Sequence, residues 1–401
     1  MNDLNPFAPG AWKDPYPLYA ELRRTGIHKL PDAIIFLASR YKHVQQIMQH
    51  PEIFSVKDVA TTLMRETPEF IQAHAEGWPQ VHTFTAEPEE HDRYRGLVAE
   101  NFSAQSIDKL APRIRAVVEE LVDSFARDGQ VEFIKQFAEP LALRNLGYLV
   151  GIEPEEMPQV KFWCDELRER MSGSVSYDRE MEMVRGHVAF QRYLFNKLEQ
   201  RRAAPRQDII SHLLSVHMPD GRQLSTEELM SMTWMLLVAG SGSSIFFFGN
   251  AMLLLAQHPE VAEELRSDPA LIPNFIEEAM RFESPIQALF RTAKVDTDLG
   301  GVKIPAGFRV ATLYGSANRD EEIFPNADRF DVRRANAKEH LALGENIHTC
   351  LGAGLSRLEA AIAFEALLNR LQDIRVVNYE RLPTPIYRGL TAARLQFRPS
   401  I

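Results

Sequence analysis

The sequence predicts a mainly α-helical protein with small β-sheets, and three features support this fold class. Long segments with apolar residues at helical spacing fill the middle of the chain. One uncharged stretch around position 240 is long enough to form a single central helix. A shorter stretch beyond Pro285 alternates in polarity and carries glycine pairs, which is typical of hairpin strands. We expect one domain over residues 1–401.

The composition is that of an ordinary soluble globular protein. The 401 residues are 45% hydrophobic and 25% charged, enough for a large core. The two cysteines, Cys164 and Cys350, cannot form a disulfide framework, and the N-terminus resembles no signal peptide. We therefore expect a cytoplasmic protein. A formal net charge of −10 argues against a general nucleic-acid binder.

The N-terminal part mixes helices with a strand. We expect a short helix that opens at Asp14-Pro15-Tyr16 and ends before Gly26, a strand around Ile34–Leu37 and a helix at Tyr41–His50. Periodicity is poor from Asp58 to Glu87, which predicts a long loop with a short helix, and loops of this length are usually functional or mobile.

Further helices follow this loop. Pro88 opens a helix that places His91 and Arg95 one turn apart, a spacing that a solvated helix face would also explain. The next helices are predicted at Ile107–Arg127, Phe133–Leu149, Pro154–Met171 and Asp178–Arg202.

The uncharged stretch from Leu229 to His258 could by length cross a bilayer. Glycines and serines interrupt it at residues 240–244 and no basic anchor lies close by, so we expect a core helix and no membrane span. Ser225 and Glu228 form a capping box at its start. The weak helix formers at 239–244 indicate a kink, a groove for another body, or close packing of crossing helices.

The C-terminal part surrounds Cys350. A helix at Ile272–Phe282 carries Glu278 and Arg281 in apolar surroundings, and another is predicted at Leu355–Leu371 before a β-like tail. A thiol just before a helix lies among unpaired N–H groups that favour the thiolate, the form that binds metal. A single cysteine is nevertheless more often a small buried hydrophobe.

Together these segments resemble the cytochrome P450 family of haem-thiolate monooxygenases, of the soluble bacterial type, over essentially the whole chain. The family's cysteine loop, Phe-Gly-x-Gly-x-His-x-Cys-x-Gly, is matched by residues 343–352, with Leu343 for the phenylalanine and Asn346 for the second glycine. The resemblance implies a helical prism in which the long central helix crosses the haem.

The resemblance also implies a cofactor site. Cys350 would be the axial ligand of the iron of haem b, since the family's thiolate favours O–O cleavage. Cations and donors would hold the two buried haem propionates. The residues that match the family's cofactor contacts are His91, Arg95, Ala239, Gly240, Arg291, Gly344, His348, Cys350 and Gly352.

Two further sets of residues are implied. Glu278, Arg281 and Arg329 resemble a buried structural triad that is not catalytic. An apolar pocket is expected for a terpenoid, steroid, fatty acid or aromatic substrate. The substrate candidates are Phe246, Phe247, Gln287, Leu289, Phe290 and Leu390.

The central helix departs from the family pattern, Ala-Gly-x-acid-Thr. Gly242 stands at the acid and Ser243 at the threonine, with Ser244 as a second hydroxyl. In the family, acid and alcohol relay protons to oxygen. We expect hydroxylation by Ser243 and ordered waters. A peroxide-driven enzyme, a non-oxidative rearrangement or dehydration, and a haem-based sensor are alternatives.

The resemblance implies a separate electron donor, a ferredoxin or flavodoxin, because the chain has no room for a reductase domain. Lys109, Arg113 and Arg115 are candidates for its basic docking patch, although a solvated helix face explains the same pattern. We expect a monomer.

Overall fold

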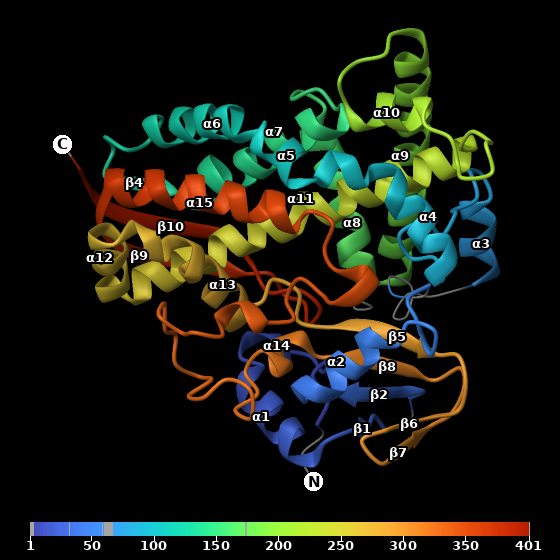
Figure 1. Cartoon of the computed structure of the whole chain (residues 1–401), viewed down its shortest axis with the longest axis horizontal. Helices are drawn as coiled ribbons and strands as arrows, with labels where there is room; N and C mark the ends of the chain where they lie inside the picture. The colour runs from blue at the N-terminus through green and yellow to red at the C-terminus, as the bar shows by residue number, and fades with distance from the viewer. Residues whose placement is uncertain (1–3, 32, 58, 60–66, 173–174, 401) are drawn as a thin grey trace. The chain divides into compact units, whose positions relative to one another are not determined.

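The computed structural model describes residues 4–31, 33–57, 59, 67–172 and 175–400 (Figure 1). By its internal contacts the chain divides into two compact units. Unit 1 comprises Met1–Phe54, Ala104–Leu141 and Ser243–Ile401, and unit 2 comprises Ser55–Ser103 and Ala142–Gly242. The chain is 55% helical with small sheets, so the predicted fold class is confirmed. One domain over residues 1–401 stays a prediction.

Unit 1 contains the larger mixed sheet, drawn in blue and orange in the lower part of Figure 1. Its strand order is β1-β2-β8-β5-β3, with β2 and β8 parallel and β5 antiparallel to β8. Strands from both ends of the chain therefore share one sheet. The strands are β1 His28–Lys29, β2 Ile35–Ala38, β3 Phe54–Ser55, β5 Leu289–Ala293 and β8 Arg309–Thr312.

Short helices pack beside this sheet in one hydrophobic core. α1 spans Tyr16–Thr25 and α2 spans Tyr41–Gln49, close to the predicted bounds. Val44 and Ile47 of α2 are buried with Phe36 of β2 and Val310 of β8. The apolar face of α2 therefore covers the sheet.

Unit 1 also holds the C-terminal helices and the remaining sheets. α15 contacts α5, α6, α12 and α13. Sheet β4-β10-β9 is antiparallel, as is the β6-β7 hairpin. The helices are α5 Ala104–Asp108, α6 Ala111–Asp123, α12 Pro259–Ser267, α13 Ile272–Phe282, α14 Tyr314–Ala317 and α15 Ala353–Arg370. The strands are β4 Gln130–Glu132, β6 Thr297–Leu299, β7 Val302–Ile304, β9 Leu371–Arg381 and β10 Leu390–Pro399.

One helix expected at Ile107–Arg127 is wrong as a single element. The structure has α5 and α6 with a break at Lys109–Leu110. Pro112 lies in the first turn of α6, where its missing N–H is tolerated, but it cannot donate the bond to the carbonyl of Asp108 that one continuous helix would need. The apolar spacing runs through the break and conceals it.

Unit 2 is helical. α9 contacts α3, α8 and α10, and α10 contacts α4. The short helix expected in the Asp58–Glu87 loop is α3, whereas 58 and 60–66 lie outside the described residues. The helices are α3 Pro68–His74, α4 Pro88–Val98, most of α7 Glu139–Val150, α8 Met157–Met171, α9 Tyr177–Ala203, α10 Ile209–Ser215 and the first half of α11 Thr226–Gln257.

The central helix α11 is continuous through its glycines and serines. The capping box is confirmed: the Glu228 N–H donates to Ser225 Oγ at 3.2 Å, and the Ser225 N–H donates to Glu228 Oε2 at 2.7 Å. α11 is long and apolar enough to span a membrane by composition alone, but 67% of its most apolar window is buried. This burial is typical of a core helix.

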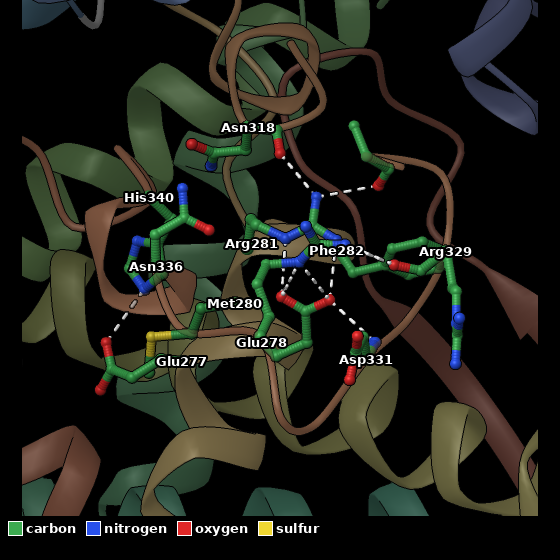
Figure 2. A network of polar contacts seen from close by, with 12 residues as sticks. Glu277, Glu278, Met280, Arg281, Phe282, Asn318, Arg329, Asp331, Asn336 and His340 are labelled. Atoms are coloured by element: carbon green, nitrogen blue, oxygen red, sulfur yellow. Dashed lines mark hydrogen bonds and ion pairs between the residues drawn. The ribbon is translucent and has the colours of Figure 1, made fainter. Parts of the chain in front are cut away.

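The ion-pair network of α13 is the most buried polar feature of unit 1 (Figure 2). Glu278 and Arg281 are both 0% exposed, and Arg281 Nε and Nη2 donate to the two oxygens of Glu278 at 2.7 and 2.8 Å. The remaining Arg281 hydrogens go to backbone carbonyls of Asn318, Ala327 and Arg329. A guanidinium has five N–H donors, so Arg281 is fully satisfied.

The third member of this network is Arg334, and its assignment to Arg329 is wrong. Arg334 Nε lies 3.1 Å from both oxygens of Glu278, and its side chain is 7% exposed. Arg329 is exposed and contributes only its carbonyl, which accepts from Arg281 and Arg334. Figure 2 shows its side chain directed away from Glu278.

Arg334→Ala and Arg329→Ala should therefore differ sharply in stability. We expect Arg334→Ala to lower the free energy of unfolding by about 3 kcal/mol or more, because it removes one partner of a buried ion pair. Arg329→Ala should change it by less than about 0.5 kcal/mol, since its carbonyl remains. Denaturant unfolding of both variants measures this, and equal losses would contradict the assignment.

Candidate functional site

Cys350 lies in a turn between a 3₁₀ segment, Asn346–His348, and the start of α15. Its N–H donates to the carbonyl of Leu343 at 2.7 Å, which closes the loop. Gly344 has a φ of 71° and Asn346 a φ of 61°, both in the left-handed region. Asparagine tolerates this region better than most residues, so Asn346 keeps the backbone shape of the glycine it replaces.

A second acid of α13 holds the flanks of the cysteine loop. Glu277 accepts from Nε and Nη2 of Arg357 at 2.6 and 2.9 Å, and His340 Nε2 lies 3.2 Å away (Figure 2). Burial opposes ionisation of Glu277, but Arg357 and His340 outweigh it and lower its pKa to about 2. The loop is therefore anchored on both sides of Cys350 by one carboxylate, which the sequence analysis missed.

Cys350 itself is exposed. The hydrogen bonds to Glu277 are the main cause that raises the pKa of Arg357. The neighbouring Cys350 makes a smaller contribution to this pKa in the same direction. Among the described residues, no three His, Cys, Asp or Glu side chains gather to hold a metal ion. A metal at Cys350 would therefore take most of its ligands from a prosthetic group.

Arg291 is a buried cation on β5. It is 7% exposed, and its Nη1 donates to the carbonyl of Phe290 at 2.9 Å. No described residue places a carboxylate within ion-pair distance of it. A buried guanidinium is stable only beside an anion or several acceptors, so Arg291 fits an external carboxylate such as a haem propionate.

One face of α11 is open where the rest of the helix is buried. Ala239 is exposed, and Gly240, Ser243 and Ser244 are half-buried, as is Met235 one turn before Ala239. Residues four apart lie on one helix face, so these positions form one open strip along α11. The strip contains the predicted oxygen-activating segment.

The two remaining cofactor candidates lie on α4, in unit 2. His91 is buried, and burial is the main cause that lowers its pKa, with Asp92 opposing. Arg95 is half-buried one turn later on the same helix. Gly352 is the N-cap residue of α15. Their roles toward a cofactor stay predictions.

The glycines of α11 make room for side chains of other helices. A Cβ on Gly240 would lie 2.8 Å from Leu146 of α7, and a Cβ on Gly242 would lie 2.8 Å from Cζ of Arg168 of α8. Close helix packing, one of the sequence alternatives, is therefore present at both glycines. The contact with Arg168 was not predicted, since about seventy residues separate the two positions.

The predicted substrate residues fall into two groups. The ring of Phe247 packs against Phe248 and Phe364, so it lies in the core. Phe290 contacts Phe7 and points to the opposite face of β5 from Leu289 and Arg291. Sequence spacing alone could not distinguish Phe247 and Phe290 from the other predicted substrate residues.

The other substrate candidates lie nearer the predicted site. Leu289 shares a strand face with Arg291. Phe246 lies against Tyr387 and Gly389, beside buried Leu390. Gln287 is buried and donates to the carbonyl of Ser284 at 2.7 Å.

Comparison with known proteins shows the family of the chain. The cytochrome P450 family model matches residues 176–372. Cytochrome P450 107B1 of Saccharopolyspora erythraea is 34% identical, over 93% of this chain and 92% of its own length. The vitamin D(3) 25-hydroxylase of Pseudonocardia autotrophica is 33% identical, over 96% and 92%. The solved structure of CYP109Q5 from Chondromyces apiculatus covers 98% of both chains, with a TM-score of 0.86 and 33% identity.

The fold and the relatives place the chain in the class of haem-thiolate enzymes. The chain belongs to the cytochrome P450 family and is a monooxygenase. Its cofactor is haem b with thiolate ligation, its substrate is a small molecule, and a redox partner supplies electrons.

Cys350→Ser should abolish the thiolate signature of the haem. We expect the reduced, carbon-monoxide-bound wild type to show the Soret band of thiolate-ligated haems and the variant to lack it, because a serine hydroxyl stays protonated and binds iron poorly. Cys164→Ser is the matched control, since Cys164 is buried in unit 2. A thiolate band that survived in Cys350→Ser would contradict the ligand assignment.

Proposed function

We propose that the protein hydroxylates a hydrophobic small molecule in the cytoplasm, using oxygen and electrons from a separate ferredoxin-type partner. The observation that carries the proposal is the anchored Cys350 loop together with the buried, unneutralised Arg291. When bound, the haem activates oxygen and inserts one oxygen atom into the substrate. The chain binds substrate, excludes water and delivers protons.

Several of the predicted residues would hold the cofactor. Cys350 would supply a thiolate ligand to the iron, and Arg291 and His348 would supply donors to the propionates. His91 and Arg95 are proposed for the same carboxylates, because charge-assisted hydrogen bonds are the strongest available to a buried anion. Gly344 and Gly352 shape the loop around the thiolate.

Ser243 is the proposed relay hydroxyl. Its half-buried position on the open strip of α11 supports this role, and Ser244 is a second hydroxyl on the same strip. Serine lacks the methyl group that restrains threonine, so its hydroxyl samples more orientations. We infer that ordered water, rather than Ser243 alone, completes the proton path.

The proposed substrate is apolar and of terpenoid, steroid, fatty-acid or aromatic type. Phe246, Leu289 and Leu390 support an apolar pocket wall, and one relative is named for hydroxylating vitamin D(3). Gln287 would add a polar contact. We do not place Phe247 or Phe290 in this wall, because their rings pack elsewhere.

Turnover with defined oxidants tests the proposal. We expect product with NAD(P)H, a ferredoxin system and oxygen, and little with peroxide alone or without oxidant. Ser243→Ala should lower product formed per NAD(P)H about tenfold or more, since general acid–base relays contribute at least that much. Equal product with peroxide would favour the peroxide-driven alternative, and product without oxidant a rearrangement or dehydration.

A basic patch near the cysteine loop is the proposed docking site of the electron donor. Ile107 of α5 contacts the loop side at Gly354, and Lys109 and Arg113 follow it directly. Arg115 is partly neutralised by Glu365 of α15 at 3.3 Å. Lys109 is exposed, and a cation on this face stands out against the net charge of −10.

Lys109→Glu should slow reduction by an acidic ferredoxin and flatten its dependence on salt. The expected loss is about tenfold at low ionic strength, shrinking as salt screens the charges. Stopped-flow reduction across a salt series measures this, with Lys303 of β7, whose side chain is 87% exposed, mutated to Glu as a control. A wild-type rate that does not fall with salt would contradict docking by charge.

A further inference from the structure

A buried arginine lies against α11 at the position where the family carries an acid. Arg168 of α8 has a side chain that is 7% exposed. Its Nη1 donates to the carbonyl of Val238 at 3.0 Å and to Ser241 Oγ at 3.3 Å. With Cζ only 2.8 Å from a Cβ on Gly242, the guanidinium fills the space that an acidic side chain would take.

The carboxylate that accompanies this arginine comes from α8. Asp165, one turn before Arg168, accepts a hydrogen bond from Arg168 Nη2 and also pairs with Lys161. Its side chain is 45% exposed, so bulk water can reach the carboxylate. A carboxylate is therefore still present beside this point of α11, linked to it through one guanidinium.

The other acids of α8 have different partners. Glu166 and Glu169 pair with Arg179 of α9, at 3.0 and 3.2 Å. Among the described residues, Asp165 is the acid that forms an ion pair with Arg168. The Arg168 Nε–H has no acceptor among them, which leaves this donor for a water molecule beside Gly242.

We propose that Asp165 is the proton-delivery acid that replaces the one missing at Gly242. The inference rests on the proposed function, because the protons are delivered toward Ser243. Asp165 takes a proton from bulk water at a carboxylate oxygen and releases it to a water that Arg168 orients, which regenerates the carboxylate. Arg168 stays protonated throughout and acts as a positioning residue.

Substituting the acid of α8 tests this proposal. We expect Asp165→Asn to lower product per NAD(P)H about tenfold or more and to raise the solvent isotope effect on turnover. Asp165→Glu keeps a carboxylate on α8 that can pair with the same guanidinium. This conservative substitution should keep most of the yield and an isotope effect close to that of the wild type.

Glu169→Gln is the matched control. It removes the same charge from the same helix at nearly the same exposure, 48% against 45%, but its partner is Arg179. We expect its product yield and isotope effect to equal those of the wild type. An equal loss in this control would assign the effect to the charge of α8 and overturn the role of Asp165.

Denaturant unfolding of all variants adds a measurement that needs no turnover. We expect Asp165→Asn to lower the unfolding midpoint and Asp165→Glu to lower it less, because the glutamate carboxylate can still pair with Arg168. If Asp165→Asn lowers the midpoint but leaves the yield unchanged, Asp165 is only a counter-ion and the inference is wrong. If the wild type gives no product with oxygen and electrons, the proposed function fails first and this inference with it.

Discussion

The site depends on the ion pairs that the buried carboxylate of Glu278 forms. Two guanidiniums, Arg281 and Arg334, converge on it in a region without solvent. Removing such ions from water costs several kcal/mol each, and the cost is offset only because nearly every N–H finds an acceptor. Most of those acceptors are carbonyls of the loop from Asn318 to Arg329. The network therefore shapes an irregular backbone that has no helix or strand to hold it.

Hydrogen bonds connect this irregular backbone to the loop that holds Cys350. Asn318, whose carbonyl binds Arg281, accepts the N–H of Leu341 on its side-chain oxygen at 2.7 Å. Leu343, two residues later, accepts from Cys350. Glu277 holds the same loop through His340 and Arg357. Two consecutive acids of α13 thus position the thiolate without contacting it, and ligands set this way need few adjustments when the metal binds.

Much of the fold was predictable because the sequence signals that begin most helices lie within the helices themselves. The capping box of α11 and the prolines that open α4 and α6 act within a turn of the residues that show them. The break between α5 and α6 was missed because apolar spacing continues across it. Contacts between residues far apart in the sequence were harder to predict. Arg329 and Arg334 are both close in sequence to the loop, and only the direction of their side chains shows which one pairs with Glu278.

The same limit explains the site. Cys350 and Gly344 were proposed from the sequence because they belong to a local motif with fixed spacing, and Arg291 because it matches a family position. Phe247 and Phe290 looked equally suitable as pocket residues, but strand alternation and aromatic packing direct them elsewhere. Glu277 and Arg168 carried no signal, since their partners lie eighty and about seventy residues away.

Two departures from the family pattern have opposite consequences. Asn346 replaces a glycine but adopts its left-handed backbone, so the cysteine loop is unchanged in shape. Gly242 replaces an acid, and nothing in its backbone compensates for a lost carboxylate. Arg168 fills the space and neutralises no new charge there, so the acid function must come through the arginine's own partner or be absent. Gly242 is therefore important because its missing side chain leaves room for the guanidinium of Arg168.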